Sequence, residues 1–117
     1  AKSPLVQIFH NLIGNALKYQ KLNNPPIINL TVTENEKNWL FKIEDNGIGI
    51  EKEYLNKIFI IFQRLHTKKE YSGNGMGLAI VKKLIENLNG IIWVESEVNK
   101  GSTFYFTLPK NEPTKKN

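Results

Sequence analysis

Two pairs of predicted strands, each joined by a turn of a few residues, limit the folds that this chain can adopt. Alternating apolar residues or β-branched and aromatic runs predict strands at 27–33, 39–44, 91–95 and 102–108. Turns are predicted at 35–38 and 96–101. Turns this short make antiparallel hairpins, because a parallel pair needs a crossover of about a dozen residues or more. The sequence therefore predicts a mostly antiparallel sheet rather than a parallel, doubly wound one.

Two amphipathic helices are predicted outside these hairpins. The first covers 4–20, where Ser3 can act as the N-cap and the apolar residues share one broad face. The second covers 77–88 and is followed by Gly90, a residue suited to a left-handed cap. A shorter helix is expected at 51–58. Two main helices on one face of an antiparallel sheet make an α+β fold, a two-layer sandwich.

Composition excludes several classes of function. The 117 residues suffice for one domain and contain no cysteine, which excludes disulfide scaffolds, thiol nucleophiles and thiolate metal sites. Two histidines are too few for a histidine-based metal cluster. The net charge of +5 favours polyanionic partners, namely nucleic acid, anionic membranes or nucleotide phosphates, although a solvated basic surface gives the same charge. No apolar run approaches the roughly 20 residues that span a membrane.

The first helix carries an unusual polar face. Gln7, Asn11, Asn15 and Lys18 fall within a narrow arc opposite the apolar stripe. A solvated face would normally carry Glu, Lys or Arg, which form helices better than asparagine does. An amide oxygen is a hard ligand that suits Mg²⁺, and an amide nitrogen can donate to phosphate oxygens. The face is therefore either a solvated surface or a site for a metal and a phosphate.

Two glycine-bearing segments are further candidates. Asp45-Asn46-Gly47-Ile48-Gly49-Ile50 follows a predicted strand, and by itself it is more typical of a hairpin turn than of a binding site. Gly73-Asn74-Gly75-Met76-Gly77-Leu78 leads directly into a predicted helix, where backbone N–H groups and the helix N-terminus can surround phosphates. It is neither a Walker A loop nor a dinucleotide fingerprint, and a flexible hinge remains its alternative.

Taken together and in order, these segments resemble the catalytic ATP-binding domain of bacterial two-component sensor histidine kinases. This domain belongs to a superfamily that also contains gyrase, the ninety-kilodalton heat-shock chaperones and MutL. Residues 11–19 look like the N box, 45–50 the first glycine box, 59–64 the F box, 73–78 the second glycine box and 101–104 the closing glycine segment. The resemblance implies the Bergerat ATP-binding fold over 1–108. The tail at 109–117 is expected to be disordered.

The resemblance also implies a role for each matched residue. Asn11 would bind Mg²⁺, Asn15 and Lys18 would meet the phosphates, and Arg64 would neutralise charge at the γ-phosphate. Asp45 would accept a hydrogen bond from the adenine amine, with Thr103 beside it. The remaining implied ATP-binding residues are Tyr19, Gly47, Gly49, Ile50, Gly73, Gly75, Met76, Gly77 and Leu78. A lid is expected over about 65–74.

Two departures from the family pattern refine the expected activity. Gln7 stands where several ATPases of the superfamily have a glutamate that activates water, so phosphoryl transfer is expected rather than hydrolysis. Neither His10 nor His66 lies in an acceptor signature, and His10 is expected to be a helix-surface residue. The chain also begins almost at the N box, without the upstream strand usual in the family. It is therefore expected to be an excised fragment whose phosphate acceptor lies outside the chain.

The expected function is that of a cytoplasmic protein-histidine kinase domain with ATP and Mg²⁺ as cofactors. Its expected partners are the dimerisation and phosphotransfer domain of the same parent protein and, downstream, a response regulator. Contact with a membrane would come only through other parts of the parent protein. The alternatives are an ATPase that drives conformational change, a serine kinase acting on an anti-sigma partner, and a nucleic-acid-binding module. The last is disfavoured because the aromatic residues follow core spacing rather than lying among surface lysines.

Overall fold

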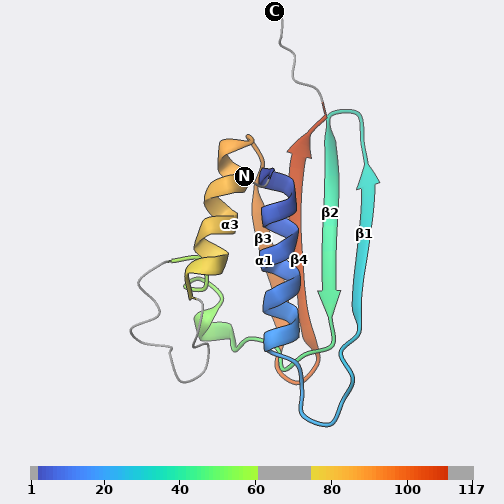
Figure 1. The fold of residues 1–117 in the computed structure, drawn as a ribbon, viewed down its shortest axis with the longest axis vertical. Coiled ribbons are helices and arrows are strands. Elements are labelled where there is room, and N and C mark those ends of the chain that lie inside the picture. The colour runs from blue at the N-terminus through green and yellow to red at the C-terminus, as the bar shows by residue number, and fades with distance from the viewer. Residues whose placement is uncertain (1–2, 61–74, 111–117) are drawn as a thin grey trace, which may run out of the picture.

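The computed structural model describes residues 3–60 and 75–110, except for the side chain of Met76. It confirms the α+β sandwich (Figure 1). The strands form one antiparallel sheet in the order β1-β2-β4-β3, and the helices α1 and α3 lie side by side against one of its faces. The elements are α1 (Pro4–Lys18), β1 (Ile28–Glu34), β2 (Asn38–Asp45), the 3₁₀ turn η1 (Lys52–Tyr54), α3 (Gly75–Asn87), β3 (Ile92–Glu97) and β4 (Gly101–Pro109).

The core lies between the two helices and the central strands. Phe41 of β2 and Phe106 of β4 are stacked with 4.6 Å between ring centroids, and Phe9 of α1 meets the Phe41 ring edge-on. The largest fully buried side chains of this core are Ile8, Leu12, Ile43, Val81, Ile85 and Phe106. Burying an aliphatic or aromatic side chain of this size contributes about 1.5–3 kcal/mol, so this layer fixes how the two helices sit on the sheet.

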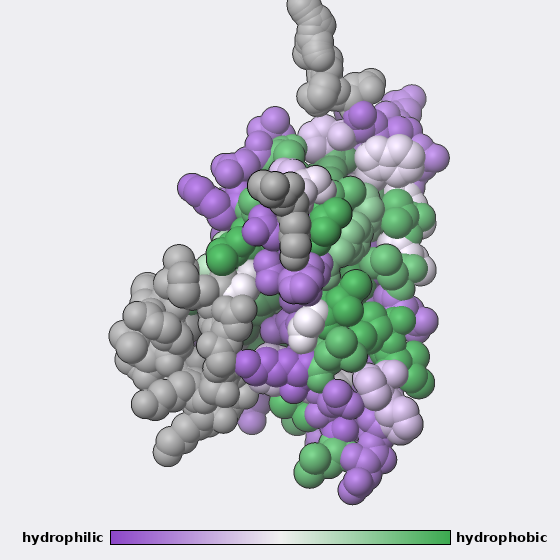
Figure 2. Space-filling view, viewed as in Figure 1, coloured by the Kyte–Doolittle hydropathy of each residue, from purple (hydrophilic) through white to green (hydrophobic). Residues whose placement is uncertain are grey.

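Strand β1 forms an edge of the sheet, and the helices cover it less well. Its residues Leu30 and Val32 pair with Ile43 and Phe41 and so point to the same side as the core. Yet they remain 48% and 47% exposed, because α1 and α3 lie over the other strands (Figure 1). Hydrophobic residues accordingly show on the β1 side of the molecule in Figure 2.

The ends of the elements differ slightly from the sequence-based expectations. The predicted cap is confirmed, since Ser3 Oγ accepts a hydrogen bond from the amide of Val6 at 3.2 Å. The helix predicted at 51–58 is only a single 3₁₀ turn. After α3, the left-handed residue is Asn89, with φ of 68°, and not Gly90. Gly90 is needed for space instead, because a Cβ there would lie 1.9 Å from the carbonyl oxygen of Thr107.

Candidate functional site

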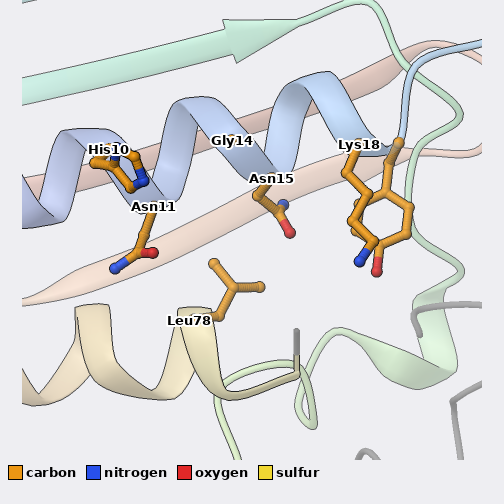
Figure 3. A pocket seen from close by; sticks show the side chains of 8 residues that line it. His10, Asn11, Gly14, Asn15, Lys18 and Leu78 are labelled. Carbon is orange, nitrogen blue, oxygen red and sulfur yellow. The ribbon is translucent and has the colours of Figure 1, made fainter. Parts of the chain in front are cut away.

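A cleft of about 210 Å³ lies between α1 and the start of α3. Figure 3 shows the side chains of Asn11 and Asn15 leaving α1 on the same side and pointing toward Leu78 of α3. The cleft is lined by His10, Asn11, Gly14, Asn15, Lys18, Tyr19, Gly77 and Leu78. Two amides and an ammonium group, four and three residues apart on one helix, therefore face one cavity, which is more than a solvated surface requires.

The donor set of the cleft suits a cation that is already bound to phosphates. Among the described residues, the lining contains no carboxylate, and no cluster of three His, Cys, Asp or Glu side chains could hold a metal alone. Mg²⁺ is commonly held by one or two protein oxygens together with water and substrate phosphates. The amide oxygens of Asn11 and Asn15 fit this minor share of the ligands, and Lys18 adds positive charge.

Helix α3 presents its N-terminus to the same cleft. It begins at Gly75, and both Gly77 and Leu78 in its first turn line the cavity. The first N–H groups of a helix have no partner within the helix, and the helix dipole places partial positive charge at this end. Backbone donors from α3 and the cation of Lys18 thus favour an anion between the two helices.

The loop after β2 adjoins the Tyr19 end of the cleft. Asp45 ends β2 and accepts a hydrogen bond from the amide of Gly47 at 2.8 Å, while the amide of Ile48 donates to the carbonyl oxygen of Tyr19 at 3.0 Å. Gly47 is required here because a Cβ would lie 2.5 Å from that carbonyl oxygen. The loop therefore holds a partly buried carboxylate close to the cleft.

The hairpin between β3 and β4 supports this loop from the other side. Ser102 donates its amide to Asp45 Oδ1 at 3.2 Å, and Asn99 donates its amide to the carbonyl oxygen of Ile48 at 2.8 Å. Gly49, with φ of +79°, passes so close to β3 that a Cβ would lie 2.2 Å from the carbonyl oxygen of Glu97. Burial raises the pKa of Asp45, and the two amide donors oppose that rise only in part.

The sequence matches the histidine kinase-, DNA gyrase B- and HSP90-like ATPases over residues 1–112. The chain belongs to this family. This membership agrees with the resemblance found in the five sequence segments.

Relatives of the domain include a cyanobacterial phytochrome and a sensor histidine kinase. It is 53% identical over 105 residues to cyanobacterial phytochrome A of Nostoc sp., covering 90% of this chain and 14% of that protein. It is 36% identical over 110 residues to the sensor histidine kinase WalK of Bacillus subtilis, covering 92% of this chain and 18% of the kinase. The ATPase domain thus spans less than a fifth of the length of these relatives.

Solved structures of histidine kinases share the fold. Full-length ShkA in complex with AMPPNP superposes with a TM-score of 0.76 at 31% identity, over 91% of this chain and 21% of ShkA. A nucleotide-free catalytic domain of the histidine kinase ThkA gives a TM-score of 0.75 at 31% identity, over 92% of this chain and 66% of that one. The ATPase domain described here therefore has the architecture of histidine kinase catalytic domains.

The structure brings most of the expected site residues of this ATPase domain into two adjoining groups. Six of them line the cleft, namely Asn11, Asn15, Lys18, Tyr19, Gly77 and Leu78. Four more, Asp45, Gly47, Gly49 and Ile50, form the loop beside it. Gly75 is the first residue of α3. Arg64, Gly73, His66, the segment 65–74 and the tail from 111 lie outside the described residues, as does the side chain of Met76.

Thr103 is not brought to the base end of the site. It pairs with Glu44, whereas Ser102 pairs with Asp45, so Thr103 points to the open face of the sheet and Ser102 to the helix face. Ser102 is buried and bonds to Asp45. The alternation along β4 indicates this orientation, because Phe104 and Phe106 point inward and Ser102 lies two and four positions before them.

His10 and Gln7 are the other polar residues in the N-terminal half of α1. His10, expected on the helix surface, is exposed but lines the cleft beside Asn11. Gln7 was grouped with the amides of the polar face, yet it does not line the cleft.

Proposed function

We propose that this domain binds Mg-ATP in the cleft and donates the γ-phosphate to a histidine on a separate dimerisation domain. The observation that carries the proposal is the single α1 face of Asn11, Asn15 and Lys18, which opens opposite the N-terminus of α3. Such a pair of facing elements supplies amide oxygens, a cation and backbone donors to one triphosphate. The Asp45 corner, which consists of Asp45 and the residues Gly47 and Ser102 that donate to it, supports the proposal. It would provide a carboxylate for the base at the adjoining end of the cleft.

Each residue group has a distinct proposed role. Asn11 would hold Mg²⁺ through its amide oxygen, and Asn15 with Lys18 would hold the phosphates. When bound, Mg²⁺ neutralises charge on the phosphate oxygens. Asp45 would accept a hydrogen bond from the adenine amine and repel the carbonyl oxygen that guanine carries there, while Tyr19 would pack against the nucleotide. Arg64 is proposed to approach the γ-phosphate.

Transfer is favoured over hydrolysis by the composition of the cleft. Among the residues that the structure describes, no carboxylate lines it, and Gln7 cannot accept a proton from water. The protein then contributes mainly positioning and charge neutralisation, which is what phosphoryl transfer requires. This feature separates a kinase from the family members that hydrolyse ATP to drive conformational change.

The proposed partners follow from the relatives, which are much longer than this chain. They are a dimerisation domain that carries the acceptor histidine and a response regulator that receives the phosphate, both in the cytoplasm. No helix within residues 3–60 and 75–110 is long and apolar enough to cross a membrane.

Calorimetric titration with ATP tests the binding part of the proposal. The chain should bind ATP in the presence of Mg²⁺, and Asn11→Ala should weaken binding much more in Mg²⁺ than in EDTA, because it removes a metal ligand. Asn29→Ala, an exposed asparagine on β1, is the matched control and should bind as the unmodified chain does. Equal losses for Asn11→Ala with and without Mg²⁺ would contradict the metal role, and no binding at all would contradict the proposal.

A further inference from the structure

A pair of serine hydroxyls lies behind the Asp45 corner. Ser96 of β3 and Ser102 of β4 face each other across the hairpin with 2.8 Å between their Oγ atoms. Ser96 Oγ also accepts a hydrogen bond from the amide of Ile50 at 2.8 Å and donates to the carbonyl oxygen of Gly101 at 2.9 Å. The pair thus connects the glycine loop, residues 46–50, to the start of β4 at Gly101. Ser102 itself is the residue that pairs with Asp45 in the sheet.

The proton on each hydroxyl can be assigned from its partners. A serine hydroxyl has one proton and two lone pairs. The carbonyl oxygen of Gly101 can only accept, so the proton of Ser96 is used there. The Ile50 amide occupies one lone pair of Ser96, and the bond to Ser102 must occupy the other. Ser102 therefore donates its own proton to Ser96 and keeps only lone pairs for any third partner.

The carboxylate beside Ser102 has the same polarity. Within the described residues, both hydrogen bonds to Asp45 end on Oδ1, which leaves the lone pairs of Oδ2 for another partner. Ser102 is 7% exposed, so bulk water has little access to its hydroxyl. With the proton of Ser102 directed away toward Ser96, the Asp45 carboxylate and the Ser102 hydroxyl offer acceptors here, and the described residues supply no side-chain donor beside them.

We propose that Ser96 is a positioning residue that keeps the Ser102 hydroxyl in the acceptor orientation, so that the corner selects a purine with a 6-amino group over one with a 6-oxo group. The inference rests on the proposed binding of a purine nucleotide with its base against Asp45. A 6-amino group donates, which both acceptors satisfy. A 6-oxo group accepts, and it would meet two acceptors at once. Removing the Ser96 hydroxyl would free Ser102 to rotate and donate to the 6-oxo group.

The test compares the affinity of the 117-residue chain for Mg-ATP and for Mg-ITP, whose hypoxanthine base carries the 6-oxo group. Ser96→Ala should lower the ratio of ATP to ITP affinity by about 3- to 10-fold, the effect of one neutral hydrogen bond. Ser102→Ala should also lower it. In the Ser102→Ala background, Ser96→Ala should change the ratio no further, because Ser96 acts through Ser102.

Control variants separate this role from a general loss of stability. Ser96→Thr keeps the hydroxyl and should keep the ratio, whereas Val94→Ala, on the same face of β3, should lower the melting temperature and leave the ratio unchanged. If Ser96→Ala does not fold, Ser96→Cys, with a weak donor and acceptor of similar size, should shift the ratio in the same direction. An unchanged ratio in folded Ser96→Ala, or in Ser96→Cys where the alanine variant does not fold, overturns the inference, as does a full effect of Ser96→Ala in the Ser102→Ala background. Failure of the unmodified chain to prefer ATP would instead contradict the proposed base contact.

Discussion

At the scale of single residues, the carboxyl group of Asp45 connects the sheet to the candidate base site. It ends β2, accepts amides from the glycine loop and from β4, and lies close to the cleft without lining it. Burial raises its pKa, because an ionised carboxylate loses favourable contact with water, and this costs free energy of folding. Such a cost is typical of a carboxylate whose charge is used to bind a ligand. Two predictions test whether the charge is used.

The first prediction concerns replacement of the carboxylate. Asp45→Asn should weaken ATP binding by about 1.5–3 kcal/mol, the range for a hydrogen bond to a charged group, and should narrow the preference for ATP over GTP. The asparagine Oδ1 can still accept the amides of Gly47 and Ser102, so the fold should be retained. Titration calorimetry measures both affinities, and unchanged ATP affinity in a folded variant would rule out the base contact.

The second prediction concerns pH. An ordinary aspartate protonates around 3.8, and burial moves this event in Asp45 to higher pH. Because only the ionised carboxylate repels a 6-oxo group and binds an amine strongly, ATP affinity should fall as pH is lowered through the raised pKa. The measurement is ATP affinity as a function of pH, with Asp45→Asn as control for titration of the nucleotide itself. Parallel curves for the two proteins would contradict the prediction.

Residue faces were the least predictable level from the sequence. Membership of α1, the glycine loop and β4 could be read from their patterns, and so could the chemistry of Asn11, Asn15 and Asp45. The motif at 101–104 gives the order of Ser102 and Thr103 but not which side of the strand each one faces, and the pairing with β2 places Ser102, not Thr103, opposite Asp45. His10 is exposed on the helix surface, as expected, but no sequence pattern indicates that it also lines the cleft between α1 and α3.

At the scale of elements, α1 packs against the core with one face and lines the cleft with another. Ile8, Leu12 and Ala16 are buried against the sheet and α3, while the other side lines the cleft. Gly14 lies on the cleft side in the middle of the helix, and a Cβ there would meet nothing within 4 Å. Neither packing nor backbone conformation therefore explains this glycine.

We accordingly predict that Gly14→Ala stabilises the domain. Alanine favours a helix interior by about 0.8–1 kcal/mol over glycine, and open space removes any steric penalty. Urea unfolding should show a higher midpoint with an unchanged slope. Ser3→Ala gives the matched opposite change, a loss of about 0.5–2 kcal/mol from the lost cap. A destabilised Gly14→Ala variant would mean that the helix is strained at this position.

The glycine loop makes the reverse prediction. Gly49 has φ of +79° and stands against the backbone of Glu97. Gly49→Ala should destabilise the domain by at least about 1 kcal/mol from backbone strain alone, with more from the displaced hairpin. It should weaken ATP binding together with stability, since the Asp45 corner depends on the same hairpin. Urea unfolding and calorimetry on one sample distinguish this outcome from an effect on binding alone.

Element boundaries show where local sequence rules stop. Both hairpins and both helices were predictable, because their apolar periods and turn residues agree with the fold. The end of α3 was not, because Asn89 took the left-handed conformation while Gly90 was reserved for contact with β4. Such contacts between distant segments leave no local signal.

At the scale of the whole molecule, no described residue that lines the cleft lies in a phosphoacceptor signature. We predict that the isolated chain binds Mg-ATP but neither labels itself nor hydrolyses ATP at a useful rate. Adding the cognate helical domain should place acid-labile, base-stable phosphate on a histidine of that partner. Radiolabelled ATP with and without the partner measures this. Label on His10, which lines the cleft, or rapid phosphate release by the isolated chain would contradict the mechanism.

The pairing of β2 with β4 also governs how this chain can reach its native state. Asp45 and Ser102, which meet in that pair, are 57 positions apart, and nearly everything between them must be closed into a loop before the two strands touch. Pairing at such separation makes folding slow, so we expect the central strands to join late. A polypeptide still emerging from the ribosome would then have no affinity for nucleotide until β4 has been synthesised. After β4 has been synthesised, nucleotide would bind only the folded chain and would therefore shift the folding equilibrium toward the folded state.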